Sequence, residues 1–157
     1  MIFVACDHAG LELKQALMAK LPNLNWQDLG TNSAESVDYP DFAKKCSEKI
    51  LENPAALGLL ICGTGIGMSI AANKIHGIRA AAVSEAFSAR MAREHNEAQI
   101  LCLGARVVDA DKAAECLEAF MKAKVDSSER HARRVAKIMR LEDVSGADNA
   151  KRESKSI

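Results

Sequence analysis

The chain has 157 residues, of which 48% are hydrophobic and only 4% aromatic, a composition typical of one domain with a full hydrophobic core. Lysine plus arginine and aspartate plus glutamate balance at 21 each. This balance excludes the strongly basic footprint that binding to nucleic acid or to an anionic membrane requires. We therefore expect neither as a partner, and any basic site must be local.

The N-terminus and the cysteines indicate the compartment. Met1 is followed at once by the apolar segment IFVAC, which leaves no room for a signal peptide, and no apolar run is long enough to span a bilayer. The five cysteines are odd in number, scattered, and lack the spacing of a zinc site or a disulfide framework. We expect free thiols and a cytoplasmic protein.

In the first third of the chain, short apolar runs alternate with amphipathic stretches. This alternation is typical of βα units that build a parallel sheet. Pro40 suits the first turn of a helix. In chain order, the segments predict a strand over 2–6, a helix over 10–21, a short strand over 25–30 and a helix over 40–52.

The same alternation continues from the apolar run LGLLIC at 57–62, which predicts a strand buried on both faces. A glycine turn and a helix-like stretch follow it. Further on, the sequence predicts strands over 78–83 and 98–104, a helix from its N-cap Ser84 to about Arg93, a helix over 112–124 capped by Asp109 or Asp111, and a basic helix over 128–142. We expect one domain over 1–143 and a polar, flexible tail over 144–157.

A parallel sheet of this kind places its ligands outside the carboxyl ends of the strands. Asp7 and His8 follow the first predicted strand, and Cys62 ends the third. His95 and Asn96 end a helix just before the fifth strand, where we also expect a carboxyl end. A lone histidine is more often a surface residue than a catalyst, but two such histidines favour a functional role.

The turn CGTGIG after the third strand carries glycines at every second position: Gly63, Gly65 and Gly67. A dinucleotide fingerprint spaces its glycines differently, a phosphate-binding P-loop ends in a lysine, and a cysteine phosphatase loop needs an arginine where Met68 stands. None of these motifs fits. Glycines still allow a tight turn whose N–H groups stabilise an anion, either an enediolate oxygen or a thiolate.

Cys62 lies beside these N–H groups, which favour the thiolate and so make the cysteine a candidate base. The alternative is a buried cysteine that ends a core strand, which is our interpretation of Cys6 and Cys102. The hydroxyl of Thr64 could serve chemistry or simply bond backbone groups of the turn.

Local basic residues are a second candidate site. Arg130 and Arg134 are four residues apart in a predicted helix and so share a face that could clamp a phosphate. A solvated basic face is the alternative. Arg106, after the fifth strand, is open to both interpretations.

Together these segments resemble the B-type ribose-5-phosphate isomerases, within the wider family that includes the galactose-6-phosphate isomerase subunits. The resemblance runs in order from residue 1 to about 142. It rests on CDHAG (6–10), DYP (38–40), ICGTGIGMSIAANKIHGIRAA (61–81), EHN (94–96), LGARVV (103–108) and RHARRV (130–135). The cysteine form of the turn with its SIAANK continuation is typical of the ribose-5-phosphate branch.

The resemblance implies a role for each site residue. Cys62 matches the general base, Thr64 and His95 match residues that assist ring opening, and the amides of Gly63, Gly65 and Gly67 match an oxyanion hole for a cis-enediolate. The substrate hydroxyls would be bound by Asp7, Tyr39 and Asn96. The phosphate would be bound by His8, Arg106, Arg130 and Arg134.

The resemblance also implies a Rossmann-like, three-layer α/β fold with a five-stranded parallel sheet and a C-terminal helix used in dimerisation. It implies isomerisation of D-ribose 5-phosphate and D-ribulose 5-phosphate without metal or nucleotide cofactor, in a homodimer or tetramer. Cys62 and Thr64 of one subunit would face His95, Asn96 and Arg106 of its partner. Isomerisation of a six-carbon sugar phosphate such as allose 6-phosphate or galactose 6-phosphate, a non-catalytic sugar-phosphate-binding protein, and nucleotide binding at the turn stay open.

Overall fold

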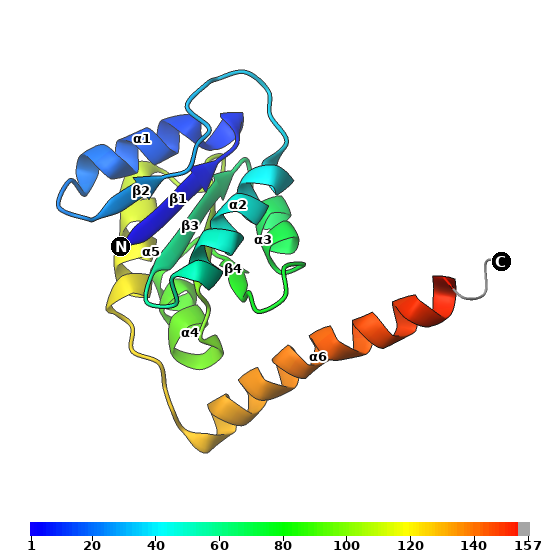
Figure 1. The fold of residues 1–157 in the computed structure, drawn as a ribbon. Coiled ribbons are helices and arrows are strands. Elements are labelled where there is room, and N and C mark those ends of the chain that lie inside the picture. The colour runs from blue at the N-terminus through cyan, green and yellow to red at the C-terminus, as the bar shows by residue number, and fades with distance from the viewer. Residues whose placement is uncertain (154–157) are drawn as a thin grey trace.

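The computed structural model describes residues 1–153, and the side chains of residues 1–143. Its centre is a sheet of five parallel strands in the order β2-β1-β3-β5-β4 (Figure 1). The strands are β1 (Ile2–Cys6), β2 (Trp26–Asp28), β3 (Leu57–Cys62), β4 (Ala80–Ala82) and β5 (Ile100–Gly104). All five predicted strands are present, which confirms the predicted parallel sheet.

Helices cover both faces of the sheet and make the predicted three layers (Figure 1). One face packs against α1 (Leu11–Lys20), α4 (Ala86–Asn96) and α5 (Ala110–Lys122), and the other against α2 (Tyr39–Glu52) and α3 (Ile66–Ala72). A short 3-10 helix, η1 (His8–Gly10), joins β1 to α1. Because helices cover both faces, the central strands β1, β3 and β5 are buried on both sides and are almost wholly apolar.

Several predicted boundaries shift for local reasons. The edge strands β2 and β4 keep only three residues each, because each pairs with a neighbour on one side only. The cap predicted at Ser84 is wrong, since the carboxylate of Glu85 accepts the N–H groups of Phe87 and Ser88 at the start of α4. Asp109 caps α5 through the N–H of Lys112, which settles the choice between the two predicted caps.

The last helix, α6 (Glu129–Glu153), extends well beyond the predicted end at residue 142. It begins beyond α4 and α5 and points away from the sheet (Figure 1). Its N-terminal half is anchored by the buried side chains of His131 and Val135, and by Glu142, whose carboxylate accepts the N–H of Gly77 at 3.1 Å. Residues 154–157 lie outside the described residues, and the flexible tail expected over 144–157 stays a prediction.

The order of the strands fixes where a ligand can bind. The chain passes from β1 outward to β2, and then returns to place β3 on the other side of β1. Between β1 and β3 the connecting loops therefore diverge at the carboxyl ends, which is where such sheets usually bind their ligands. Asp7 follows β1 and Cys62 ends β3, so both predicted site residues lie at this switch point.

No helix within the described part of the chain combines the length and the apolar character needed to cross a membrane.

Candidate active site

Cys62 ends β3 at the switch point of the sheet and is 5% exposed. The N–H of Gly65 points back at its sulfur, at 3.2 Å. A backbone donor aimed at sulfur stabilises negative charge there, as a thiolate base requires.

The core interpretation of Cys6 and Cys102 is confirmed, because both are fully buried and burial raises the pKa of the Cys6 thiol to about 11 and that of Cys102 well above its usual value.

The turn after Cys62 depends on Gly65, which adopts a left-handed conformation with φ of +78°. A Cβ at this position would also lie 2.9 Å from the carbonyl carbon of Leu103 in β5. The turn therefore packs its backbone directly on the end of the neighbouring strand. This contact holds the Gly65 N–H in line with the sulfur of Cys62.

The other two glycines make room for functional side chains. A Cβ on Gly63 would lie 3.3 Å from the guanidinium of Arg106, and one on Gly67 would lie 2.8 Å from the ring of Tyr39. Arg106 and Tyr39 therefore lie on the same turn as Cys62, within one chain. The expectation that Arg106 reaches Cys62 only from a partner subunit is wrong, because its own β5 loop folds over Gly63, with the Arg106 N–H donating to the Gly63 carbonyl at 3.0 Å.

Asp7 and His8 follow the neighbouring strand β1, beside the end of β3. The N–H of Asp7 donates to the carbonyl of Ile61, beside Cys62, at 3.1 Å, and its carboxylate accepts the N–H of Gly10 at 3.0 Å. The exposed ring of His8 accepts the N–H of Val37 at 3.3 Å through Nδ1. The structure thus brings Asp7 and His8 to the Cys62 side, as predicted.

Thr64 is exposed on the turn, and its Oγ1 accepts the N–H of Ile66 at 3.4 Å. The structural role considered for its hydroxyl is therefore present. Exposure also leaves the hydroxyl open to a ligand, so the two roles are compatible.

Lys14 is a functional support that the sequence did not reveal. Its ammonium group is 1% exposed and donates to both carboxylate oxygens of Asp28, to the carbonyl of Thr31 and to the side chain of Asn32, at 2.7 to 3.0 Å. These bonds fix the start of the loop that continues past Val37 to Tyr39. The one clue in the sequence is the position of Lys14 on the buried face of α1, next to Leu13 and Leu17.

His95 and Asn96 end α4, as predicted, but they lie at the amino ends of the strands. Helix α4 runs antiparallel to the sheet, so its last turn meets Arg79 just before β4, where Arg79 Nε donates to the Asn96 carbonyl at 2.9 Å. The expectation that His95 lies near a carboxyl end is wrong. Arg130 and Arg134, both exposed on the first turns of α6, belong to the same end of the molecule.

The two groups of residues are far apart in one chain. Gln99, soon after α4, accepts the N–H of Gly58 at the start of β3, at 2.9 Å. From Gly58 the strand advances four residues before it reaches Cys62, a distance of about 13 Å at 3.3 Å per residue. The predicted site residues therefore form two groups. We call Asp7, His8, Tyr39, Cys62, Thr64 and Arg106, with the glycine turn, the cysteine half-site, and His95, Asn96, Arg130 and Arg134 the histidine half-site.

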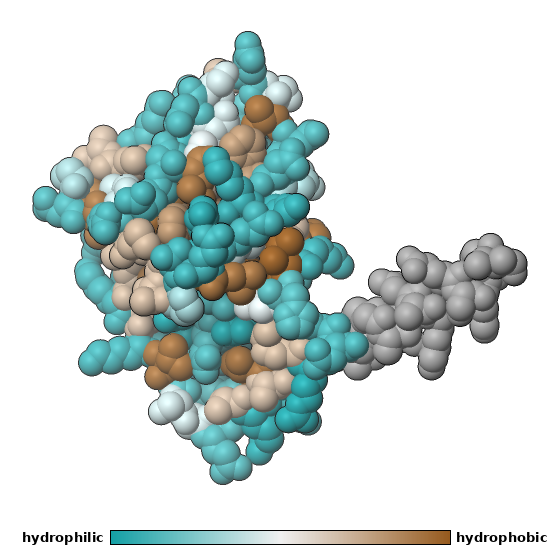
Figure 2. All heavy atoms as spheres, viewed as in Figure 1, coloured by the Kyte–Doolittle hydropathy of each residue, from teal (hydrophilic) through white to brown (hydrophobic). Residues whose placement is uncertain are grey.

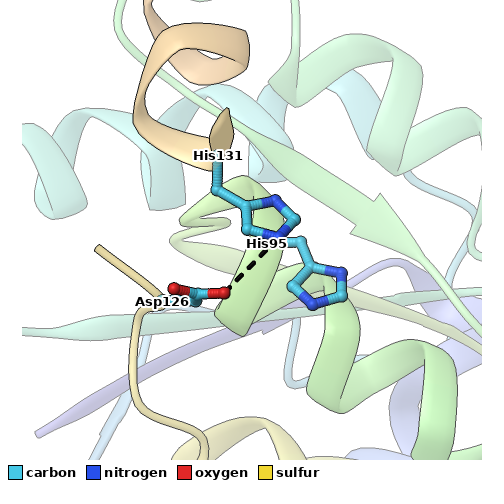
Figure 3. Close-up of side chains that lie close together, drawn as sticks. All are labelled: His95, Asp126 and His131. Carbon is cyan, nitrogen blue, oxygen red and sulfur yellow. Dashed lines mark ion pairs between the residues drawn. The ribbon is translucent and has the colours of Figure 1, made fainter. Parts of the chain in front are cut away.

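The histidine half-site contains a cluster of His95, Asp126 and His131, whose nitrogen and oxygen atoms lie within 4.8 Å of one another (Figure 3). Such spacing could suggest a metal ion. The two imidazole rings are nearly parallel, however, with centroids 4.1 Å apart and an interplanar angle of 8°. Since a ring nitrogen binds metal in its own ring plane, two stacked rings cannot direct their lone pairs at one ion. Asp126 and His131 were not predicted from the sequence, where the segment RHARRV points to its arginines alone.

This combination of fold and site defines a class: an α/β protein with a thiol that accepts a backbone N–H at the switch point of a parallel sheet, suited to acid–base chemistry on a small ligand. A family profile described as Ribose/Galactose Isomerase matches residues 2–138. The chain belongs to this family.

Curated relatives and solved structures agree with this assignment. The chain is 40% identical over 143 residues to ribose-5-phosphate isomerase B of Escherichia coli, covering 90% of this chain and 95% of that protein. It is 41% identical over 145 residues to ribose-5-P isomerase B of Listeria innocua, covering 91% and 95%. Its structure is similar to ribose-5-phosphate isomerase B of Clostridium thermocellum, with a TM-score of 0.86 at 45% identity, covering 92% of this chain and 98% of that one.

The Mycoplasma genitalium ribose-5-phosphate isomerase B, solved with bound ribulose-5-phosphate, is also similar. Its TM-score is 0.84 at 42% identity, and the match covers 90% of this chain and 95% of that one.

Proposed function

We propose that the protein interconverts D-ribose 5-phosphate and D-ribulose 5-phosphate through a cis-enediolate, a reaction of the pentose phosphate pathway in the cytoplasm. Its family and its similarity to isomerases of this type, one of them with bound ribulose-5-phosphate, support the proposal. The observation that carries it is the Gly65 N–H aimed at the sulfur of Cys62 at the switch point of the sheet.

Cys62 acts as the base. Its thiolate removes the C2 proton of the opened aldose, which leaves an enediolate with its negative charge on O1. The O2 hydroxyl proton passes to O1, and the resulting thiol returns a proton at C1, which gives the ketose and restores the thiolate. Because the Gly65 N–H already serves the sulfur, the developing oxyanion is stabilised by other N–H groups of the glycine turn. No metal or nucleotide cofactor is needed, because a base and fixed N–H donors suffice for proton transfer beside a carbonyl.

The remaining residues of the cysteine half-site bind the substrate. Asp7 and Tyr39 flank Cys62 and bind sugar hydroxyls, while His8 and Arg106 bind the phosphate. Thr64 assists ring opening from its exposed place on the turn.

The histidine half-site completes the site of a second subunit. Within one chain, His95, Asn96, Arg130 and Arg134 are too far from Cys62 to contact the same sugar phosphate. In a homodimer, or a tetramer built from it, His95 assists ring opening, Asn96 binds a hydroxyl and the two arginines bind the phosphate of the substrate held by the partner.

Exposed apolar side chains support such an assembly. Ile66 and Ile70 of α3 are each 57% exposed, and Ile138 and Leu141 of α6 are 41% and 67% exposed. Figure 2 shows brown apolar patches on a surface that is otherwise largely teal. Exposed apolar side chains of this kind are stabilised when a second copy covers them.

Turnover of ribose 5-phosphate, with metals chelated, tests the proposal. Cys62→Ala and Cys62→Ser should each lower turnover by about 10²- to 10⁴-fold, because a hydroxyl ionises far less readily than a thiol and a methyl group not at all. Cys102→Ala makes the same chemical change in the same core cluster and should affect stability alone.

Wild-type turnover of Cys62→Ser, or of the C62A protein, would show that Cys62 is not the base. Faster turnover of allose 6-phosphate than of ribose 5-phosphate would favour the six-carbon reaction. Binding of both compounds without turnover would indicate a regulator, and binding of NAD in a titration would reopen nucleotide binding at the turn.

A further inference from the structure

The cluster at the histidine half-site joins three separate elements. His95 comes from the last turn of α4, Asp126 from the loop after α5, and His131 from the first turn of α6 (Figure 3). The ring of His95 is half-buried and that of His131 is 5% exposed. His131 therefore lies beneath His95, as a flat support for its ring.

Asp126 fixes the distance between the two helices. Its backbone N–H donates to the carbonyl of Glu94 in α4 at 2.8 Å, and its carboxylate accepts the N–H of Ser128 at 2.9 Å. The carbonyl of Ser128 in turn accepts the N–H of His131 at 3.0 Å. The two stacked rings are thus held by a continuous series of hydrogen bonds that joins the two helices.

His131 is unusual because it buries a polar imidazole ring. Nε2 of His131 is buried without a hydrogen-bond partner among the described residues, and it lies 3.4 Å from the Asp126 carboxylate. Burial, then neighbouring His95, Arg130 and Arg134, lower the pKa of His131, while Asp126 opposes them. A neutral His131 can stack on His95 without like-charge repulsion.

We propose that His131 is a positioning residue for His95: it holds the His95 ring in one orientation, the one that faces the substrate of the partner subunit during ring opening. This inference rests on the proposed function. No described residue hydrogen-bonds the His95 side chain, and the stack with His131 restricts the rotation of its ring. Loss of an aromatic stack should cost roughly tenfold in the fraction of correctly oriented rings.

The chemistry of the two sugars allows a test that separates ring opening from proton transfer. Ribose 5-phosphate is mainly a closed furanose and must be opened. Ribulose 5-phosphate cannot close, because the C5 oxygen that would attack its C2 carbonyl carries the phosphate. In D₂O, the Cys62 thiolate removes a C1 proton from ribulose 5-phosphate, exchanges it with solvent and returns deuterium, without any need for His95.

We expect His131→Ala to lower turnover of ribose 5-phosphate roughly tenfold and to leave deuterium exchange at C1 of ribulose 5-phosphate unchanged. His131→Phe keeps a flat ring under His95 and should retain turnover. Val135→Ala removes a buried side chain one turn further along α6 and should lower thermal stability without changing the ratio of turnover to exchange. Equal losses of turnover and exchange in the H131A protein, or equal losses of turnover in the Ala and Phe variants, would overturn the inference.

NMR of the His95 ring protons provides a readout that does not depend on activity. In the wild type and in His131→Phe, the stacked ring should shift these signals upfield, and His131→Ala should abolish the shift. Unchanged signals in the alanine variant would refute the stack as the restraint on His95. If the wild type neither isomerises nor exchanges, the proposed function fails, while the NMR comparison still decides whether His131 positions His95.

Discussion

Mixing two inactive variants tests whether a functional site needs two chains. Cys62→Ala destroys the cysteine half-site, and His95→Ala weakens the histidine half-site. Within one chain the two groups lie at opposite edges of the sheet, and β3 alone spans about 13 Å between Gly58 and Cys62. A single sugar phosphate does not bridge such a separation, so the proposed function requires each active site to combine a base and a ring-opening group from different chains.

The expected recovery follows from how subunits combine. After random exchange between equal amounts of the two variants, about half of the dimers are mixed. In each mixed dimer one site carries both lesions, while the other combines an intact Cys62 with an intact His95. Turnover should therefore recover to about a quarter of the wild-type value per chain.

The assay is turnover of ribose 5-phosphate before and after mixing, with native mass spectrometry to verify that subunits have exchanged. A mixture of Cys62→Ala with Thr64→Ala is the matched control, because both residues belong to the same half-site and every mixed site keeps a lesion. Absence of recovery despite verified exchange, or equal recovery in the control, would refute the shared site and leave the role of Cys62 untouched.

Three further changes test individual contacts. Gly65→Ala should lower the free energy of unfolding by about 3 kcal/mol in chemical denaturation, because φ of +78° and the backbone of β5 both oppose a Cβ, and wild-type stability would contradict this. Lys14→Met should lower the free energy of unfolding by about 3 kcal/mol because the Asp28 carboxylate loses its cation. The double variant with Lys14→Met and Asp28→Asn should recover part of the loss. Arg134→Ala should raise KM for ribose 5-phosphate by about one to two orders of magnitude with little change in kcat, and inorganic phosphate should inhibit it less. The exposed neighbour Arg133 is its control, and an equal effect of Arg133→Ala would indicate a general effect of basic charge on α6.

The core of the cysteine half-site could be placed from the sequence because Asp7 directly follows a strand and Cys62 ends one. In a parallel sheet all carboxyl ends meet at one edge, so the order of residues along the chain is enough to place a residue that follows a strand. Asp7 after β1 and Cys62 at the end of β3 both obey this rule. The continuous apolar run at 57–62 likewise left no doubt about β3, whose bounds match the prediction.

The histidine half-site could not be placed in the same way. His95 ends a helix that returns antiparallel to the strands, so its proximity to β5 along the chain puts it at the amino edge. His95 stacks on His131 because the loop through Asp126 brings the start of α6 against the end of α4. The sequence pattern does not predict the path of that loop. Lys14 was missed for a related reason, since its partner Asp28 lies on a strand and no periodic pattern reports a charge pair between elements.

The spacing of the three glycines shows why this turn is not a nucleotide motif. Each glycine removes a Cβ for a different neighbour: Gly63 for the guanidinium of Arg106, Gly65 for the backbone of β5, and Gly67 for the ring of Tyr39. A nucleotide-binding loop instead uses its glycines to let a pyrophosphate approach the backbone. Here the side chains of the same protein occupy that space, so the turn surrounds its cysteine with a cation and a phenol. Such a site fits a ligand that carries both hydroxyls and an anionic group.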